Sequence, residues 1–249
     1  MIIANLIGRL GNQLFEVGAG LSLANKLNTD FYIKDYINQG PYQMIEKFHK
    51  YNNNNENRIF VKESDDFTFI KLPDNKEYNY ELFGYWQTEK YMDKKLIRNL
   101  FKISDSLKKK MITKYGNLSE AVGIHIRRGD YLKNENKRIF IQPNINWYKS
   151  IYEKYFKGKK VIVCSDDIEW CKNNLNIPNA IYANGTPEED LYTLSECKHH
   201  ICSNSSFSWW GAWLNEKEDS INIFPSKWFT EESKIKDDNL IPDRWIKEN

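Results

Sequence analysis

Neither sign of charge predominates in this sequence, and long apolar runs are missing. The chain has 36 Lys and Arg residues against 34 Asp and Glu residues over 249 positions, whereas proteins that bind nucleic acid through its phosphates normally carry a clear basic excess. No apolar run approaches the roughly 18 to 20 residues that span a bilayer. Residues 1–8 are apolar but have neither a basic leader nor a small-residue cleavage site. We therefore expect no nucleic-acid partner, no transmembrane segment and no signal peptide.

Cysteine is scarce and does not occur in closely spaced pairs. The four cysteines, which fall in predicted strands and helices, are Cys164, Cys171, Cys197 and Cys202. The segment 197–202 also holds two histidines and could be read as a zinc cluster, but strand alternation would scatter these side chains. We expect reduced, buried thiols and a cytoplasmic protein, with peripheral attachment to a membrane left open.

The beginning of the chain predicts a strand, a glycine-containing loop, a helix and a second strand. The strands are residues 2–6 and 31–33, the loop is residues 8–13 and the helix is residues 14–27. The loop lacks the third glycine of a dinucleotide fingerprint, so it is a weak signal by itself. Asn12 and Gln13 would either cap the helix or offer their amides to a polar ligand.

The chain after residue 117 alternates strands with helices. Strands are expected near 121–127, 160–164, 179–183, 199–202 and 221–224, and helices near 146–156, 167–175, 187–197 and 207–215. This order is typical of an α/β fold with a mostly parallel sheet. The pattern is less regular earlier, where helices are expected near 89–101 and 107–115 and residues 52–57 form a polar, Asn-rich loop. We expect two α/β domains, residues 1–117 and 118–249, with a ligand cleft between them.

A short apolar strand near 122–126 ends in two arginines, Arg127 and Arg128, which are followed by Gly129 and Asp130. Neighbouring side chains of a strand point to opposite faces, so one arginine can reach a ligand while the other braces the turn. A guanidinium group binds phosphate through a rigid fork of donors, which suits a strand end that faces an anion. The alternative is an ion pair between one arginine and Asp130 that only holds the turn.

Three further segments of the second half place polar or acidic side chains at the ends of strands or the beginnings of helices. Asp166 and Asp167 follow the strand near 160–164, and Asp190 lies near the start of the helix at 187–197. Residues 203–208 form a polar loop that leads into a helix, whose free amides favour an anion. Each could be an ordinary helix cap, but the carboxyl ends of parallel strands meet at one edge of a sheet, where ligands bind. We expect these segments to contribute to one site.

Four segments, in chain order, resemble the motifs of the α-1,2-fucosyltransferases. HIRRGDY at 125–131 is similar to their HxRRGDY signature, and GRLGNQLF at 8–15 is similar to their GxLGNQxF. GYWQ at 84–87, followed by Tyr91, and SNSSFSWWGAWL at 203–214 also match, so the resemblance extends over most of the chain. Arg9 departs from the usual Gly. Residues 40–80 are short and rich in Asn, and in related enzymes this region shapes access of the acceptor.

This resemblance implies a GT-B-like glycosyltransferase with two Rossmann-type domains, the first on the acceptor side and the second binding the GDP-sugar. It would transfer L-fucose from GDP-fucose, in α-1,2 linkage and with inversion, to a glycan for which we expect a terminal galactose. No metal or other cofactor is expected. Arg128, with Arg127, would stabilise the β-phosphate of the departing GDP. The other donor residues are expected to be Asp166, Asp190, Asn204, Ser205, Ser206 and Phe207, and those of the acceptor side or cleft to be Gly11, Asn12 and Gln13.

The general base is left open among Asp130, Glu135 and His125, and a dissociative transition state would need little help from any base. Two other functions are weighed against fucosyl transfer. A metal-dependent transferase or hydrolase would use Asp166 and Asp167 as a clamp, but adjacent acids on an extended chain diverge. A non-catalytic glycan-binding protein would use some of the eight tryptophans, although the helical spacing of Trp209, Trp210 and Trp213 favours a place in the core. The sequence makes no prediction of oligomeric state.

Overall fold

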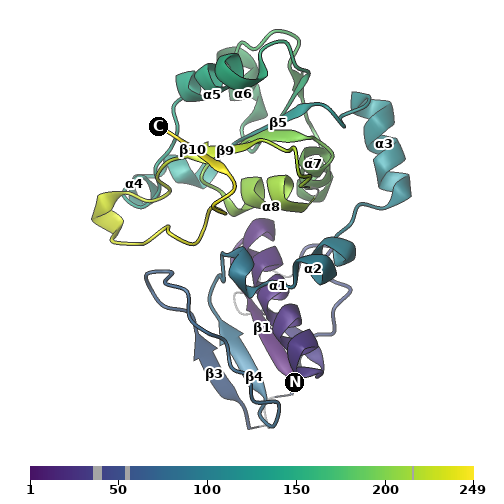
Figure 1. Ribbon diagram of the computed structural model, residues 1–249, viewed down its shortest axis with the longest axis vertical. Coiled ribbons are helices and arrows are strands. Elements are labelled where there is room, and N and C mark those ends of the chain that lie inside the picture. The colour runs from purple at the N-terminus through teal and green to yellow at the C-terminus, as the bar shows by residue number, and fades with distance from the viewer. Residues whose placement is uncertain (36–40, 54–56, 215) are drawn as a thin grey trace. The chain divides into compact units, whose positions relative to one another are not determined.

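The computed structural model describes residues 1–35, 41–53, 57–214 and 216–249 (Figure 1). The chain divides into two α/β units, one of Met1–Phe101 with Ile235–Pro242 and one of Lys102–Lys234 with Asp243–Asn249. The expected division lay at residue 117 instead. Residues 102–117 group with the second unit because α3 (Asp105–Tyr115) buries Met111 and Tyr115 in a cluster with strand residues of that unit. Asn54 to Glu56, in the Asn-rich run, lie outside the described residues.

The first unit contains a four-stranded parallel sheet. Its strands, in the spatial order β2-β1-β4-β3, are β1 (Ile2–Leu6), β2 (Phe31–Asp35), β3 (Ile59–Lys62) and β4 (Tyr80–Phe83). The chain passes from β1 to β2 on one side and places β4 and β3 on the other, so the topological switch point lies between β1 and β4. Ligands of open parallel sheets bind outside the carboxyl ends of the strands at such a point. The loops after β1 and β4 are therefore the parts of this unit that the topology places for binding.

Helix α1 (Leu10–Leu27) covers this sheet and begins one turn earlier than predicted. The chain reverses at Gly8, which has a positive φ of 75° and whose place a side chain could not take without meeting Asn12. Asn12 and Gln13 consequently lie inside the first turn of the helix rather than in the loop before it. The predicted helix at 89–101 is two elements, η1 (Glu89–Tyr91) and α2 (Lys94–Leu100), because the Asp93 carboxylate accepts from the Leu96 N–H at 3.0 Å and starts a new helix.

The second unit is built on a six-stranded parallel sheet in the order β10-β9-β8-β5-β6-β7 (Figure 1). Its strands are β5 (Val122–Ile126), β6 (Val161–Ser165), β7 (Ile181–Tyr182), β8 (His199–Ile201), β9 (Asn222–Pro225) and β10 (Ile246–Glu248). From β5 the chain moves to β6 and β7 on one side and to β8, β9 and β10 on the other. The switch point therefore lies between β5 and β8, whose carboxyl ends carry the RRGD segment and the serine-rich loop.

Helices cover both faces of this second sheet. The longer ones are α5 (Ile145–Ile151), α6 (Ile168–Asn174), α7 (Pro187–Ser195) and α8 (Ser206–Leu214), and shorter turns are η2 (Gly129–Leu132), α4 (Asn134–Lys137), η3 (Tyr152–Phe156) and η4 (Glu231–Ser233). Alternate residues of β6 divide between the faces: Val161 and Val163 pack with α5 and α6, whereas Ile162 and Cys164 pack with α7. The expectation of an α/β fold with parallel sheets is confirmed.

The tryptophans and cysteines of the second unit belong to its core. Trp209, Trp210 and Trp213 are fully buried, and the rings of Trp209 and Trp213 stack with centroids 5.4 Å apart. They are therefore core residues rather than a platform for a sugar. The four cysteines are free and buried, as predicted. Within the described part of the chain, no group of three or more His, Cys, Asp or Glu side chains is arranged to hold a metal ion. No helix among the described residues is both long and apolar enough to cross a membrane.

Candidate active site

The two arginines at the end of β5 are held by different carboxylates. Arg127 lies between Asp130, with which it forms an ion pair, and Asp166, whose Oδ2 is 2.8 Å from its Nη1. The same Asp166 accepts the backbone N–H of Arg128 through Oδ1 at 2.8 Å. Asp166 can approach this closely because residue 129 is glycine: a Cβ there would lie 2.3 Å from Oδ2. The carboxylate of Asp166 thus fixes both the Arg127 side chain and the backbone of the turn.

The Arg128 side chain takes a separate course. Its Nε donates to Oδ2 of Asp167 at 2.9 Å, and its guanidinium carbon lies 3.4 Å from the centre of the Trp170 ring. Both partners come from the end of β6 and the first turn of α6, and β6 is the neighbour of β5 in the sheet. The two arginines therefore do diverge, and each acidic side chain after β6 is engaged by a guanidinium group. In this arrangement Asp166 is paired with Arg127 and Asp167 with Arg128.

His125 is buried beneath this turn and links β5 to α8. Its Nδ1 lies 3.1 Å from Oγ of Ser203 and 2.5 Å from Oγ of Ser208. Burial, and then the nearby positive charge of Arg127, lower the pKa of His125 to about 3. At neutral pH the ring is therefore uncharged and a poor proton acceptor. The position and the pKa of His125 favour a structural role, although the sequence had left it among the candidate bases.

The other two candidate bases differ from His125 in exposure. Asp130 forms its ion pair with Arg127, and its backbone carbonyl accepts from Nδ2 of Asn136 at 2.8 Å. Glu135 lies exposed on the short helix α4. Asp130 is half-buried, so neither side chain is enclosed by the protein.

The serine-rich loop after β8 contains both structural and accessible residues. Asn204 is completely buried, and its Nδ2 donates to the backbone carbonyls of Ile141 at 2.8 Å and Lys227 at 2.9 Å. This amide joins three segments of the second unit. Ser205 accepts the Phe207 N–H through Oγ at 3.3 Å and so caps the start of α8. The half-buried Ser206 and Phe207 follow in the first turn of the helix, where backbone N–H groups favour an anion.

Asp190 lies in the first turn of α7, whose start is fixed by a capping box between Thr186 and Glu189. Its Oδ1 accepts the Gly185 N–H at 3.1 Å. Burial, only partly offset by this hydrogen bond, raises the pKa of Asp190 to about 6. The charge of Lys114 acts on Asp190 and lowers its pKa, but among the described residues the two form no salt bridge, so this half-buried carboxylate can accept from a ligand with N–H donors. Asp190 is linked to Gly185 rather than to the arginine cluster.

The predicted acceptor residues lie at the switch point of the first sheet. Gln13 is buried, with Nε2 3.2 Å from the Gly8 carbonyl and Oε1 accepting the Tyr42 N–H at 3.2 Å. Asn12 accepts from Nε2 of Gln87 at 2.9 Å, which joins the loop after β4 to the start of α1. Gly11 is buried in the same turn. These amides hold together the two loops that flank the switch point.

Sequence reasoning missed two parts of the sites. Trp170 could have been found, because it lies three residues after Asp167 on the predicted helix and therefore shares a face with it. The second part is a pair of buried carboxyl groups, Glu16 and Glu63, which accept backbone N–H groups of the loops after β1 and β4. Nothing in the local sequence around Glu63 distinguishes it from the exposed acids beside it.

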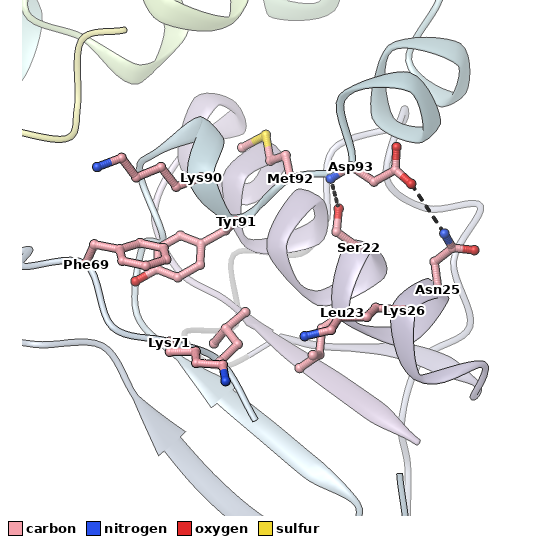
Figure 2. A pocket seen from close by; sticks show the side chains of 11 residues that line it. Ser22, Leu23, Asn25, Lys26, Phe69, Lys71, Lys90, Tyr91, Met92 and Asp93 are labelled. Atoms are coloured by element: carbon pink, nitrogen blue, oxygen red, sulfur yellow. Dashed lines mark hydrogen bonds between the residues drawn. The ribbon is translucent and has the colours of Figure 1, made fainter. Parts of the chain in front are cut away.

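A pocket of about 360 Å³ opens elsewhere on the first unit (Figure 2). Its wall includes the Phe69 and Tyr91 rings, and the Asp93 N–H donates to Oγ of Ser22 at 2.8 Å within it. The other residues that line it are Leu23, Asn25, Lys26, Lys71, Leu72, Lys90 and Met92. None of the predicted site residues is among them, so we do not place the chemistry there.

Comparison with known proteins shows what this chain is similar to. Residues 40–249 match the sequence profile described as glycosyl transferase family 11. The O-antigen biosynthesis glycosyltransferase WbnK of Escherichia coli is 31% identical, with 97% of this chain and 98% of that protein aligned. An α-1,2-colitosyltransferase of Escherichia coli is 30% identical over 99% of this chain and 98% of its own length.

The fold is also found among solved structures. The α-1,6-fucosyltransferase NodZ, in a crystal soaked with GDP-fucose, superposes with a TM-score of 0.52 and 13% sequence identity. The superposition covers 85% of this chain and 91% of that one. At this level of identity the likeness concerns the fold, and it agrees with the two parallel α/β units described above.

Proposed function

This chain belongs to glycosyl transferase family 11, and we propose that it transfers L-fucose from GDP-fucose to a sugar hydroxyl in α-1,2 linkage. Its membership confirms the resemblance to the α-1,2-fucosyltransferases and makes the chain a glycosyltransferase. The observation that carries the proposal is the pair Arg127 and Arg128 at the switch point of the second sheet, braced by carboxylates from the neighbouring strand. The reaction inverts the anomeric carbon and uses no metal.

The leaving group is GDP, and negative charge grows on its β-phosphate as the bond to the sugar breaks. A fixed guanidinium group stabilises that charge without having to reorganise, and in many enzymes such preorganised electrostatic stabilisation contributes more to the rate than any other effect. Arg128 suits this role because Trp170 and Asp167 fix its plane and one edge, which leaves other N–H groups of the fork for the phosphate. The N–H groups in the first turn of α8, near Ser206 and Phe207, add donors for the pyrophosphate.

Asp190 is our candidate for binding the guanine base. Guanine presents a ring N–H and an exocyclic amino group side by side, and a carboxylate can accept from both. Asp166 was a second candidate for the nucleoside, but its two oxygens are used by Arg127 and by the Arg128 backbone. We assign Asp166, with Asp167, to positioning the arginines, and Asn204 to holding the serine-rich loop.

The acceptor is a glycan, for which we propose a terminal galactose at the first unit, near Gly11, Asn12 and Gln13. Buried reduced cysteines are consistent with a reaction in the cytoplasm. A second candidate donor is GDP-colitose, because a relative aligned over nearly the whole chain is named as a colitosyltransferase. Colitose lacks the 3-hydroxyl of fucose. A site that hydrogen-bonds this hydroxyl would reject colitose by a large factor, whereas an apolar site would favour it.

Two measurements test the proposal. GDP should raise the melting temperature far more than ADP, because Asp190 accepts from guanine and would repel the adenine ring nitrogen. Equal protection by both nucleotides would exclude that role for Asp190, and no protection by either would favour a glycan-binding protein. Release of GDP from GDP-fucose should then rise on addition of β-galactosides. A kcat/KM that is higher with GDP-colitose than with GDP-fucose would show that colitose, rather than fucose, is the sugar transferred. Turnover of neither donor would refute the proposed function.

A further inference from the structure

Glu16 and Glu63 are buried carboxyl groups of the first unit that the donor site does not use. Oε2 of Glu16, on α1, accepts the Ile7 N–H at 2.9 Å, just after β1. Oε2 of Glu63, just after β3, accepts the Tyr85 N–H at 2.7 Å, just after β4. The two glutamates thus hold the two loops that flank the switch point of the first sheet.

The GYWQ loop is shaped around Glu63. Gly84 has a positive φ of 146°, and a Cβ at this position would lie 2.3 Å from Cβ of Glu63 and 2.8 Å from its Oε2. Glycine is therefore required for the carboxylate to lie against the loop. The same loop extends to Gln87, whose Nε2 donates a hydrogen bond to Asn12 at the start of α1. The carboxylate of Glu63 therefore holds one end of a loop whose other end, at Gln87, contacts a residue at which we place the acceptor.

Among the described residues of the first unit, three glutamates are buried, and they differ in their surroundings. Glu81 is completely buried and pairs with Lys34, at 3.1 Å, and with Arg58; although burial alone would raise the pKa, hydrogen bonds from Asn5 and these cations lower it. Glu16 is 1% exposed, whereas Glu63 is 8% exposed. Of these three carboxyl groups, Glu63 combines the lack of a paired cation, among the described residues, with some access from outside.

We propose that Glu63 is the general base that accepts the proton of the acceptor hydroxyl. This inference rests on the proposed function. As the acceptor oxygen forms its bond to the anomeric carbon, the bond between that carbon and the β-phosphate oxygen breaks, and its electron pair leaves with GDP. The hydroxyl proton passes to the carboxylate of Glu63, which releases it to water after the product departs.

The chemistry of Glu63 suits this role. Burial raises the pKa of Glu63 to about 7, with hydrogen bonds from the loop amides acting in the opposite direction. A base works best when its pKa lies near the working pH. The titratable groups that face Glu63 are Glu16, Tyr85 and Tyr91, whose own pKa values are all raised, and none of the three is a cation. His125, one of the earlier candidates, does not share this feature, since its pKa is about 3.

The test compares Glu63→Gln with Asp65→Asn at saturating GDP-fucose. In Glu63→Gln, the amide oxygen of the new side chain can still accept the Tyr85 N–H, so the loop should keep its shape. We expect kcat for transfer to fall on the order of 10²–10⁴-fold, the usual contribution of a general base, with protection by GDP unchanged. The acid limb of the kcat profile, near pH 7 in the wild type, should disappear. Asp65→Asn, the control, removes an exposed carboxylate two residues away and should keep both the rate and the limb.

Other results would overturn the inference. Glu63→Gln that folds, transfers sugar at the wild-type rate and keeps the acid limb would show that Glu63 only supports the loop. If Glu63→Gln does not fold, the wild-type profile decides: kcat that is flat between about pH 5.5 and 8 excludes a base whose pKa lies near neutrality. A wild-type enzyme that binds GDP but transfers no sugar contradicts the proposed function itself, and this outcome is recognised before any variant is made.

Discussion

The guanidinium group of Arg128 lies against the face of Trp170, with its central carbon 3.4 Å from the ring centre. A cation in this position is attracted by the electrons of the indole ring and is partly removed from water. Asp167 holds Nε from the side at 2.9 Å, so the group has a fixed plane as well as a fixed place. A charge that is oriented before substrate arrives stabilises a developing phosphate charge better than a mobile one.

Replacing Arg128 tests the centre of the proposed donor site. Arg128→Ala should lower kcat on the order of 10²–10³-fold, the scale of one preorganised donor. Arg128→Lys should remain strongly impaired, because an ammonium group cannot reproduce the bidentate geometry or the stacking. Steady-state kinetics and thermal melting should be measured on the same preparations. Lys172→Ala, which removes an exposed cation from the neighbouring helix, is the control and should behave as wild type.

Arg127→Ala should reduce the stability of the protein more than Arg128→Ala does. Arg127 bridges Asp130 and Asp166, so its loss leaves two carboxylates without their cation, and breaking such a pair costs about 3–5 kcal/mol where it is buried and less where water reaches it. We expect a lower melting temperature together with reduced kcat. If the Ala variants of both arginines fold normally and turn over GDP-fucose like the wild type, the donor site is not here.

Trp170→Leu should release Arg128 without removing its charge. A cation–π contact of this kind is worth roughly 1–2 kcal/mol, which corresponds to about a tenfold loss in kcat/KM for the donor. Trp170→Phe should lose less, because an aromatic face remains. Titration of the donor at a fixed acceptor concentration gives kcat/KM for each variant, which is compared with the wild-type value. Equal activity of the Leu variant and the wild type would mean that the stack does not orient the arginine for catalysis.

Asn204→Ala separates structural support from donor binding. The amide is completely buried and donates to carbonyl groups of distant segments, so its removal leaves these acceptors unsatisfied. We expect a loss of about 1–3 kcal/mol in the free energy of unfolding, measured with urea. The affinity for GDP in the folded variant should change little. A large loss of affinity with unchanged stability would return Asn204 to the donor site.

Asp190→Asn should change the pH dependence of stability. The pKa of Asp190 is about 6 in the folded chain and roughly 3.9 in an unfolded one, so the folded state holds this proton more tightly. The stability that this bound proton adds to the folded state is fully present below about pH 4 and is lost as the pH rises through 6. At pH 7.5 the Asn variant should therefore be more stable than the wild type, by roughly 1–2 kcal/mol after allowance for partial exposure. Below about pH 4 the two should be equal.

The same substitution should weaken GDP binding, because an amide cannot accept from both guanine donors. This loss should enter through KM for the donor with kcat preserved, since contacts to the base are the same in the ground state and the transition state. Calorimetric titration with GDP near neutral pH measures it. A variant that gains stability and loses no affinity would show that Asp190 does not contact the nucleotide.

Transfer should survive an excess of EDTA. Positive charge for the phosphates comes from Arg127 and Arg128, and the neighbouring carboxylates of Asp166 and Asp167 are already paired with these cations. The assay follows GDP release with and without chelator, and with Mg²⁺ or Mn²⁺ added back. Loss of turnover in EDTA and recovery with either ion would make the two aspartates metal ligands.

Much of the second unit could be predicted because its central strands are buried on both faces. β5 is buried at every residue and β6 at all but its last, and both are mostly apolar, which is the expected pattern for parallel strands between two helical layers. The edge strands β3 and β10 were not predicted. Three of the four residues of β3 are exposed, so the alternation that marks a half-buried strand is absent. β10 is three residues long and is defined by its pairing with β9 rather than by its composition.

The site residues divide in a similar way. The segments that carry them were predicted from strand ends and motifs, because parallel topology brings such ends together. The partners of each side chain were not, since they depend on tertiary contacts between distant residues. Asp166 binds the Arg128 backbone across 38 positions of sequence, and Glu63 binds the Tyr85 backbone across 22. Only the folded structure shows that one aspartate supports an arginine and that the pKa of one glutamate is raised to neutrality.

The division of the chain bears on how this enzyme can be recombined with its relatives. The backbone passes from one unit to the other at residues 101–102, 234–235 and 242–243. The returning segment 235–242 is integral to the first unit: Ile241 is 2% exposed, and Lys236 lies 3.0 Å from Asp66. A single crossover at residue 101 would therefore give a hybrid whose first unit contains a foreign segment. Exchange of the second unit, at which we propose that the donor binds, requires three junctions, and chimeras built with one should be recovered mainly as misfolded protein.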